Sequence, residues 1–342
     1  MNVLIDDGLS TLQQLGGIGY FSVSLWKHLK KYIDCDLTDY RYLKGLPRAV
    51  RRTIYLGLAN LESHRSRYQI IHYQNYYVPR FSGKAKRVTT VHDLAGLKSP
   101  ESYPSWYNIY FRNTLRNAVK RSDAITLPSH AAAKELVSLF PNIDSSRVYV
   151  CHHGIRSIFF TSRPEESDVV SLKLKPFSYF LFIGTLEKRK NLKFLLSQFI
   201  AAQKDSRISR DTKLVLVGKL GIGYADFKDL VSDQNNIVHL GRLSDEYIVS
   251  LYKFCKALVF PSLYEGFGVP IPEAMSQNSP IVISDIPSSV EFNHRHNNQC
   301  FVFELGRQDT LIEMLAHIDR QYAQIIPRLN YGDLSMYSYD RV

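Results

Sequence analysis

Residues 257–284 read ALVFPSLYEGFGVPIPEAMSQNSPIVIS. The apolar runs at 257–261 and 280–284 have the length and composition of buried strands. Between them the chain crosses a loop with two glycines and enters a segment typical of a helix, with Pro272 near its first turn. Apolar strands separated by helices predict a parallel sheet that is covered on both faces.

The same alternation continues on both sides of this stretch. In the second half we expect strands over 179–184, 214–218 and 237–240, and helices over 191–202 and after an N-cap at Ser244. The first half repeats the scheme more loosely, with expected strands at 3–5, 70–72, 88–92, 124–127 and 148–151 and expected helices at 19–32, 106–121 and 130–139. Because 342 residues exceed a comfortable single core, we expect an α/β protein with two domains, 1–163 and 164–342, joined by a connection over 156–176.

The composition is that of an ordinary globular protein. Hydrophobic residues make up 45% of the chain and charged residues 22%, which excludes wholesale disorder, a collagen-like chain and a disulfide scaffold. No window holds the roughly 18 apolar residues of a membrane-spanning helix, and the first residues lack the features of a signal peptide. The four cysteines lie far apart, which favours free thiols in a reducing compartment. We therefore expect a cytoplasmic protein.

The net charge of +11 lies in the first half of the chain. Residues 1–163 carry 23 Lys and Arg against 11 Asp and Glu, a net of +12, whereas 164–342 carry 20 against 21, a net of −1. Two basic stretches with apolar or aromatic residues stand out, 40–62 with Arg48, Arg51 and Arg52, and 103–121 with Arg112, Arg116, Lys120 and Arg121. Such helices suit an anionic membrane surface, although solvated faces of ordinary core helices are the alternative. No DNA- or RNA-binding motif is present, so nucleic acid is not an expected partner.

The loop after 257–261 carries two glutamates, Glu265 and Glu273, eight residues apart. Its glycines, Gly266 and Gly268, leave backbone N–H groups open to an anion, and the following helix adds partial positive charge. Carboxylates accept hydrogen bonds from vicinal hydroxyls, as sugars present them. An anion cradle with two hydroxyl acceptors predicts a nucleotide-sugar site. A plain helix entrance with solvated glutamates is the alternative.

A basic turn, GTLEKRKN at 184–191, lies between an expected strand end and a helix start. It places Lys188, Arg189 and Lys190 where open parallel sheets bind ligands. Basic groups at that place can neutralise a leaving diphosphate without a metal ion. A merely exposed basic turn is the alternative.

The first half carries weaker signals. The glycines at 16–19 precede a helix but do not form the dinucleotide fingerprint, because Ser22 stands where its third glycine belongs. His92 ends an expected strand, where it would contact a sugar hydroxyl or serve the structure alone. His152 and His153 are adjacent, point to opposite faces of a strand and therefore do not predict a metal site. The D-x-D at 34–36 lies in a polar connection, and we interpret it as a chance match to a metal motif.

Together these residues resemble the retaining glycosyltransferases of the GT-B fold, family 4, particularly the mannosyltransferase-like branch of surface-polysaccharide assembly. The similar segments follow the family's order: GGIGYF (16–21), TVHDL (90–94), SDAITLPSHAAAKEL (122–136), HHGI (152–155), GTLEKRKNL (184–192), LVLVGKLG (214–221), YEGFGVPIPEAM (264–275) and PIVIS (280–284). They cover most of the chain. The two glutamates together with the lysine loop are highly specific for the family.

The resemblance implies two Rossmann-like domains with parallel sheets facing a central cleft, the first for the acceptor and the second for the nucleotide sugar. It implies catalytic roles for His92, Lys190 and Glu265. The implied donor-binding residues are Gly17, Arg189, Lys190, Arg242, Glu265, Gly266, Phe267, Gly268, Val269 and Glu273. In these roles Glu273 binds the ribose, Lys190 and Arg189 with Gly17 bind the diphosphate, Glu265 and the backbone of 267–269 hold the sugar, and the backbone of 241–243 meets the base. His92 contacts the sugar near the reacting centre.

The implied reaction is hexose transfer with retention, without a metal ion or a cofactor other than the nucleotide-sugar substrate. The branch implies mannose from GDP-mannose, a lipid-linked oligosaccharide acceptor in O-antigen assembly, and a peripheral position on the inner face of the cytoplasmic membrane. A UDP- or dTDP-sugar donor, or a catalytically silent glycan- or nucleotide-binding module, stays open. Many relatives carry arginine where this chain has Thr185, so diphosphate neutralisation here rests on Lys190 and Arg189.

Overall fold

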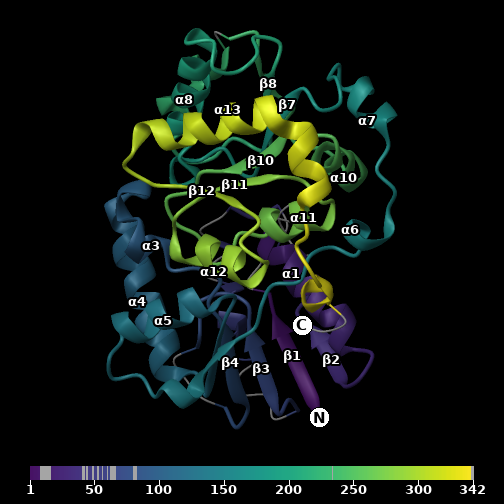
Figure 1. The fold of residues 1–342 in the computed structure, drawn as a ribbon. Coiled ribbons are helices and arrows are strands. Elements are labelled where there is room, and N and C mark those ends of the chain that lie inside the picture. The colour runs from purple at the N-terminus through teal and green to yellow at the C-terminus, as the bar shows by residue number, and fades with distance from the viewer. Residues whose placement is uncertain are drawn as a thin grey trace. The chain divides into compact units, whose positions relative to one another are not determined.

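In the computed structural model of the chain, the described residues are 1–7, 17–40, 43, 45–47, 50–51, 54–55, 57–59, 61, 67–79, 83–232 and 234–339. The chain divides into two units, each with its own sheet (Figure 1). Unit 1 comprises Met1–Leu97, Pro104–Gly154 and Tyr339–Val342, and unit 2 comprises Lys98–Tyr103 and Ile155–Ser338.

The sheet of unit 2 has six parallel strands in the order β12-β11-β10-β7-β8-β9. These strands are β7 (Tyr179–Ile183), β8 (Lys213–Val217), β9 (Ile237–His239), β10 (Ala257–Phe260), β11 (Ile281–Ser284) and β12 (Phe301–Phe303). The helices of this unit are α6 (Ile158–Thr161), α7 (Glu166–Ser171), α8 (Leu192–Lys204), α9 (Lys228–Ser232), α10 (Asp245–Lys253), α11 (Pro270–Ser276), α12 (Pro287–Arg295) and α13 (Gln308–Ile325).

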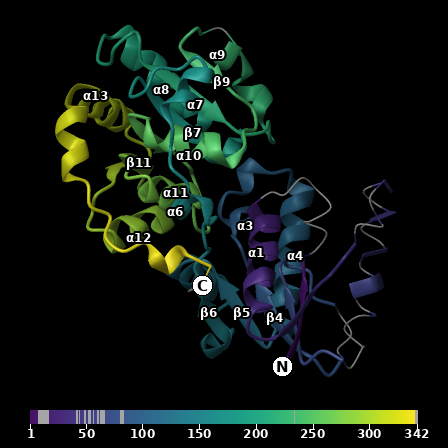
Figure 2. The ribbon, with the colours of Figure 1, turned by 90° about the vertical axis from the view of Figure 1, so that its right-hand side faces the viewer.

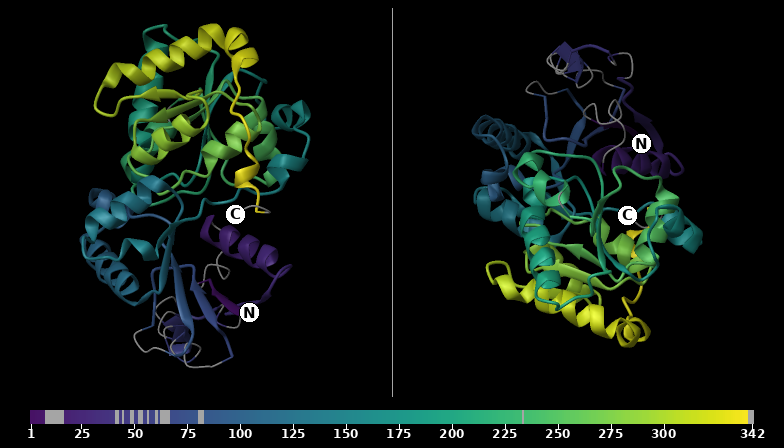
Figure 3. Two further views of the ribbon diagram at one scale, coloured as in Figure 1. Left: turned by 60° about the horizontal axis from the view of Figure 1, so that its bottom comes forward. Right: turned by 90° about the horizontal axis from the view of Figure 1, so that it is seen from above.

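Successive residues of β7 enter two different cores, because side chains alternate between the faces of a strand. Leu181 packs with residues of α7, α10, α11 and α12, whereas Phe180 and Phe182 pack with residues of α8 and α13. α8 and α13 lie side by side over this second face, and α13 forms the outer side of the unit (Figures 1, 2 and 3). The sheet is therefore buried on both faces, as its continuous apolar strands predict.

The sheet of unit 1 is also parallel and has the strand order β2-β1-β3-β4-β5-β6. Its strands are β1 (Asn2–Asp6), β2 (Asp34–Leu37), β3 (Ile70–Tyr73), β4 (Lys86–Thr90), β5 (Ala124–Leu127) and β6 (Val148–Val150). The longer helices are α1 (Gly17–Leu29), α4 (Ser105–Arg121) and α5 (His130–Leu139), with the short α3 (Ala95–Lys98) before α4. The predicted α/β class with two parallel sheets is confirmed.

The prediction for residues 34–36 is wrong, because they form an edge strand rather than a polar connection. In β2, Cys35 is buried against Val3 and Ile5 of the neighbouring strand and joins the core under α1. The carboxylate of Asp36 faces the other way, pairs with Arg67 and accepts a hydrogen bond from the Tyr68 hydroxyl at 2.9 Å. A four-residue strand with two acidic residues gives too few apolar positions to reveal its alternation.

The unit boundary falls at Gly154 and Ile155, nine residues before the expected domain boundary at 163 and 164. Ile155 and Phe159 are buried in the core of unit 2, which explains why the chain enters that unit so early. The expected connection over 156–176 instead holds α6 and α7 and belongs to this unit.

Two element ends near predicted site residues also differ from expectation. β4 stops at Thr90, so His92 lies in the segment after the strand and not in it. α1 is described from Gly17 onward, so this glycine is itself helical and not part of a preceding loop. Short elements end where backbone hydrogen bonds end, which apolar patterning alone does not locate.

All four cysteines are free thiols. Cys35, Cys255 and Cys300 are buried and Cys151 is half-buried. Burial raises the pKa of the Cys35 thiol to about 11 and that of Cys300 to about 12. None of the helices in the described part of the chain combines the length and hydropathy needed to cross a bilayer. In the basic stretch 40–62, Arg48 and Arg52 lie outside the described residues.

Candidate active site

Two loops meet at the centre of the unit 2 sheet, one after β7 and one after β10. β8 and β9 continue from β7 on one side, whereas β10, β11 and β12 continue on the other, so the winding direction reverses between β7 and β10. In open parallel sheets ligands bind beyond the carboxyl ends of the strands at such a reversal. Lys190 lies on the first loop and Glu265 on the second.

Glu265 is held between two cations of the basic turn. Its Oε1 lies 2.5 Å from Nζ of Lys190, and its Oε2 lies 2.9 Å from Nη1 of Arg189. Burial raises the pKa of this carboxyl, but the facing Arg189 and Lys190 outweigh burial and lower it to about 2. Glu265 is therefore ionised at neutral pH although only 9% of it is exposed.

Arg189 joins the two loops to each other. Its Nη1 donates to the backbone carbonyl of Tyr264 at 2.7 Å, and its Nη2 lies 2.9 Å from Oε1 of Glu187. The backbone carbonyl of Arg189 also accepts a hydrogen bond from the N–H of Leu263 at 3.0 Å. The guanidinium thus sets the separation of the loops that carry Lys190 and Glu265.

Lys190 is a buried cation at the end of η5 (Lys188–Lys190). Its Nζ lies 4.9 Å from the centre of the Phe260 ring, a cation–π distance. Burial lowers the pKa of this ammonium, and the Glu265 carboxylate works against that shift. An ammonium group has three N–H donors, so one is engaged by Glu265 and others are available to an anionic ligand.

The turn that holds Lys190 is fixed by a close backbone contact between β7 and β8. A Cβ placed on Gly218 would lie 1.8 Å from the carbonyl oxygen of Gly184, so a side chain cannot occur there without moving the strand ends. Both glycines also have positive φ, 143° and 153°. The N–H of Gly218 donates to the carbonyl of Gly241 at 2.7 Å, which ties the segment before Arg242 to the same strand ends.

Glu273, in the first turn of α11, belongs to a second buried cluster. Its Oε1 accepts from Nη2 of Arg156 at 3.0 Å, and its Oε2 accepts from the Tyr252 hydroxyl at 3.1 Å. Nη1 of Arg156 also pairs with Asp245. Burial raises the pKa of Glu273, with Arg156 opposing the shift. Arg156 and Tyr252 were missed by the sequence analysis, because they lie 117 and 21 residues from Glu273 and follow no local motif.

The remaining donor-loop residues differ in what they can offer a ligand. Phe267 is buried with its ring 4.8 Å from that of Phe292, so its side chain belongs to the core. Gly268 has φ +96°, and an added Cβ would come within 3.2 Å of two side chains. Gly266 is buried, Val269 is half-buried before α11, and Arg242 is exposed. Residues 266–269 can therefore offer a ligand their backbone groups rather than their side chains.

His92 and Gly17 belong to unit 1, whereas the other predicted site residues belong to unit 2. Nε2 of His92 lies 2.9 Å from the carbonyl oxygen of Gln74, and its Nδ1 lies 3.2 Å from Nε2 of His153. Since a carbonyl only accepts, Nε2 carries the proton and Nδ1 accepts from His153. Burial lowers the pKa of His92 to about 4, so the ring is neutral at pH 7. Among the described residues, no atom lies within 4 Å of a Cβ placed on Gly17.

His152 and His153 have different surroundings, as adjacent residues at a strand end should. Nδ1 of His152 lies 2.9 Å from the carbonyl oxygen of Pro128, whereas His153 packs against Phe21 and His92. Their rings do not share a ligand position.

Two family models match the chain. Residues 21–157 match the model described as Glycosyltransferase Family 4, and residues 164–321 match the model described as Glycosyl transferases group 1. Between them the models span 21–321 except for 158–163, and they meet close to the boundary between the two units. The chain belongs to these glycosyltransferase families. The resemblance found in its sequence motifs is thereby confirmed.

Two curated glycosyltransferases illustrate the relationship. O-antigen chain mannosyltransferase B of Escherichia coli is 32% identical over 227 residues, which are 65% of this chain and 58% of the relative. O-antigen chain mannosyltransferase RfbU of Salmonella typhimurium is 28% identical over 202 residues, 58% of this chain and 52% of the relative. The chain thus spans about half the length of the curated relatives it matches.

A solved structure shares the fold over the whole chain. The HepE protein of Anabaena, solved in complex with UDP-glucose, superposes with a TM-score of 0.71 and covers 100% of this chain and 93% of its own. At 18% sequence identity this likeness shows the fold, which is the GT-B arrangement of two parallel α/β units.

Proposed function

We propose that this chain is a retaining glycosyltransferase that moves a hexose from a nucleotide sugar to a lipid-linked oligosaccharide in O-antigen assembly. The observation that carries the proposal is the Glu265 carboxylate held by Arg189 and Lys190 at the reversal of the unit 2 sheet. Buried cations beside an ionised carboxylate match a ligand that combines a diphosphate with sugar hydroxyls.

The proposed roles follow from the donors and acceptors of each side chain. Lys190, with N–H donors beyond the one engaged by Glu265, binds the diphosphate, and Arg189 holds the loop and assists. Glu265 and the backbone of 266–269 hold the transferred sugar. Glu273, whose oxygens have further lone pairs beside Arg156 and Tyr252, accepts from the ribose hydroxyls. His92 contacts the sugar from unit 1, and Gly17 and Arg242 complete the donor site.

The proposed step is a front-face substitution at the anomeric carbon. The bond from that carbon to the diphosphate oxygen breaks, and a bond to the acceptor hydroxyl oxygen forms on the same face. The departing diphosphate oxygen takes the hydroxyl proton. Lys190 and Arg189 stabilise the negative charge that develops on the leaving group, so the proposal requires no divalent ion and no enzyme nucleophile.

We propose mannose from GDP-mannose as the transferred sugar, because both curated relatives named above are O-antigen chain mannosyltransferases. The acceptor and the inner membrane surface are proposed from the positive charge of the first half of the chain. A UDP- or dTDP-sugar is the alternative donor.

The test is a panel of nucleotide sugars presented to the purified chain, with nucleotide release as the readout. We expect GDP-mannose to be turned over, with activity unchanged by EDTA. Lys190→Ala should lower kcat about a hundredfold to a thousandfold. Lys193→Ala is the matched control, because Lys193 is exposed on α8 just after the turn, and it should retain near-wild-type kcat.

Each other outcome of this panel has a defined meaning. Equal rates for wild type and Lys190→Ala would overturn the assigned role of Lys190. Binding of a nucleotide sugar without turnover or transfer would favour the catalytically silent module. Loss of activity in EDTA that Mg²⁺ restores would overturn the metal-independent step.

A further inference from the structure

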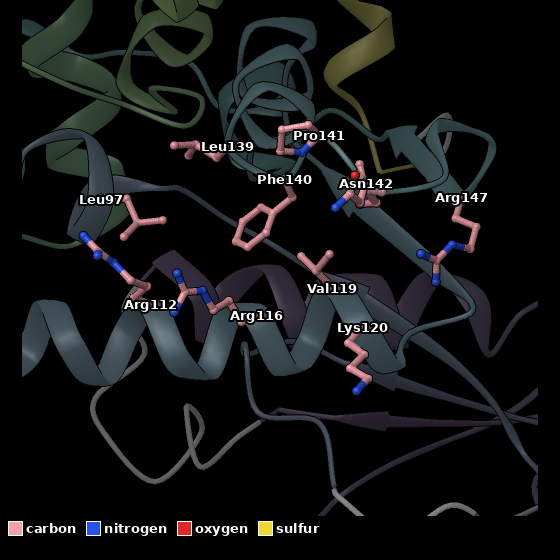
Figure 4. A pocket seen from close by; sticks show the side chains of 11 residues that line it. Leu97, Arg112, Arg116, Val119, Lys120, Leu139, Phe140, Pro141, Asn142 and Arg147 are labelled. Carbon is pink, nitrogen blue, oxygen red and sulfur yellow. The ribbon is translucent and has the colours of Figure 1, made fainter.

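A basic cavity in unit 1 lies outside the candidate active site. It has a volume of about 630 Å³ and is bounded by α4, by the end of α5 with the segment that follows it, and by Leu97 (Figure 4). Four cations line it, namely Arg112, Arg116 and Lys120 of α4 and Arg147 of η4 (Ser145–Arg147). Among the described residues that line it, none has an acidic side chain.

Three of the cations form one row along α4. Arg112, Arg116 and Lys120 are four residues apart, so they follow each other along one side of the helix, where like charges destabilise it. None of them forms an ion pair within the described part of the chain. In the candidate active site, by contrast, Arg189 and Lys190 both face Glu265. A row of uncompensated cations is the arrangement that a multivalent anion stabilises.

The other wall of the cavity is apolar. Leu139 and the Phe140 ring line it, and Val119 adds an apolar side chain from α4 itself. In Figure 4 the Arg112 and Arg116 side chains extend from α4 on the side of that ring. Arg147 enters from the opposite end, with its Nη1 held by the carbonyl of Ser122 at 2.8 Å. A ligand that fills this space needs both negative charge and hydrocarbon.

An exposed apolar stripe precedes the basic row on the same helix. Trp106 is 66% exposed and Ile109 is 63% exposed, and Tyr110 completes the stripe. At 3.6 residues per turn, Ile109 falls on the side of the helix that also carries Arg116 and Lys120. An acyl or isoprenyl chain leaving the cavity along α4 would therefore meet apolar side chains before it reaches water.

We propose that this cavity binds the phosphate or diphosphate head of a membrane lipid, with the first part of its hydrocarbon chain against Phe140 and the α4 stripe. The site is separate from the donor cluster, and its test measures binding alone, so loss of transferase activity would not affect the result.

The test uses the full chain and isothermal titration calorimetry with farnesyl diphosphate, inorganic diphosphate and farnesol as probes. The double variant R112A/R116A should bind farnesyl diphosphate about tenfold more weakly, or weaker still, because two charge-assisted contacts are lost. The matched control K84A/K134A also removes two exposed charges from unit 1, neither of which forms an ion pair with another described residue, and neither residue lines the cavity. This control should retain the wild-type affinity. Comparing variants cancels diphosphate binding elsewhere in the chain, including at the donor site.

Three results would overturn the proposal. One is equal affinity of wild type and R112A/R116A for farnesyl diphosphate. Another is equal affinity of the cavity for inorganic diphosphate and for farnesyl diphosphate, because the cavity would then be a site for a free anion and not for a lipid. The third comes from vesicles of phosphatidylglycerol in phosphatidylcholine: if both double variants weaken vesicle binding equally, general surface charge and not the cavity is responsible.

Discussion

Glu265 and Glu273 invite comparison because they are the same residue type, lie eight residues apart and are each less than a tenth exposed. Glu265 faces two cations, and they lower its pKa to about 2. Glu273 faces one cation, which it shares with Asp245, and its pKa is raised by burial. Both carboxyls are buried, so their opposite pKa shifts come from the number of cations that each one faces.

The difference shows two ways of compensating the charge of a buried carboxylate. The negative charge of Glu265 is compensated by ion pairs with Arg189 and Lys190, the two cations that the proposed diphosphate would also contact. Glu273 has one ion pair, with Arg156, and the Tyr252 hydroxyl donates a hydrogen bond in place of a second cation. Removing groups from each cluster therefore has effects of different size and different pH dependence.

The largest effect is expected for Glu265→Ala, which leaves the buried Lys190 and the half-buried Arg189 without their shared carboxylate. Breaking a buried ion pair from one side costs about 3–5 kcal/mol. Thermal and denaturant unfolding of the purified variant measures this loss. Glu304→Ala is the control, because it breaks the exposed pair with Arg307 and should cost less than about 1 kcal/mol. Equal losses in the two variants would contradict the assigned role of the cluster.

A smaller loss is expected for Arg156→Leu. The substitution leaves Glu273 buried with a hydroxyl but no cation, which costs about 2–3 kcal/mol at pH 7. The loss should shrink at pH 4, where Glu273 takes up a proton instead. Arg163→Leu is the matched control, since Arg163 is exposed nearby in the chain. A pH-independent loss would show that Arg156 acts through packing and not through the charge of Glu273.

The comparison predicts that the loss of unfolding free energy in Glu265→Gln and in Glu273→Gln changes with pH in opposite directions. The folded pKa of Glu265 is below its ordinary value of 4.5, so its stabilisation is present above pH 4.5 and is lost as the pH falls toward 2. The folded pKa of Glu273 is above 4.5, so its contribution is present below that pH and is lost as the pH rises. Unfolding curves from pH 2.5 to 7 measure the difference between wild type and each variant. If the losses of both variants change with pH in the same direction, the opposite pKa shifts of Glu265 and Glu273 are refuted.

The smallest effect is expected for Tyr252→Phe, which removes one hydrogen bond to Glu273. A hydrogen bond to a charged group contributes about 1.5–3 kcal/mol, and the remaining Arg156 contact should keep the loss at the lower end. Denaturant unfolding at pH 7 measures it. Because the ring stays in place, a loss as large as that of Arg156→Leu would mean that the hydroxyl, not the guanidinium, holds the carboxylate.

Long apolar patterns in the sequence predicted elements well. The helices at 106–121 and 130–139 appear as α4 and α5, and the strands around the Glu265 loop appear as β10 and β11. The sequence analysis placed the lysine turn and the glutamate loop each after a strand but did not pair them. They meet because β7 and β10 are neighbouring parallel strands, which end at one edge of the sheet.

What the sequence did not reveal depends on short or distant features. β2 has only two apolar residues, and β12 (Phe301–Phe303) is only three residues long. Neither strand is long enough to show the alternation of apolar and polar residues that predicts a strand. The Arg156 contact with Glu273 joins residues from separate elements, and no spacing in the sequence encodes it. The basic residues of 103–121 were evident, whereas their cavity depends on where residues 139–147 fold back over α4.

The buried cysteines provide a separate reporter for each unit. Cys35 lies in unit 1 and Cys255 in unit 2, and burial raises the pKa of both thiols. The reactive thiolate is therefore scarce in the folded chain at neutral pH, and alkylation by iodoacetamide has to wait for local opening. Mass mapping of the two labelled peptides would time the opening of each unit independently, with and without a nucleotide sugar.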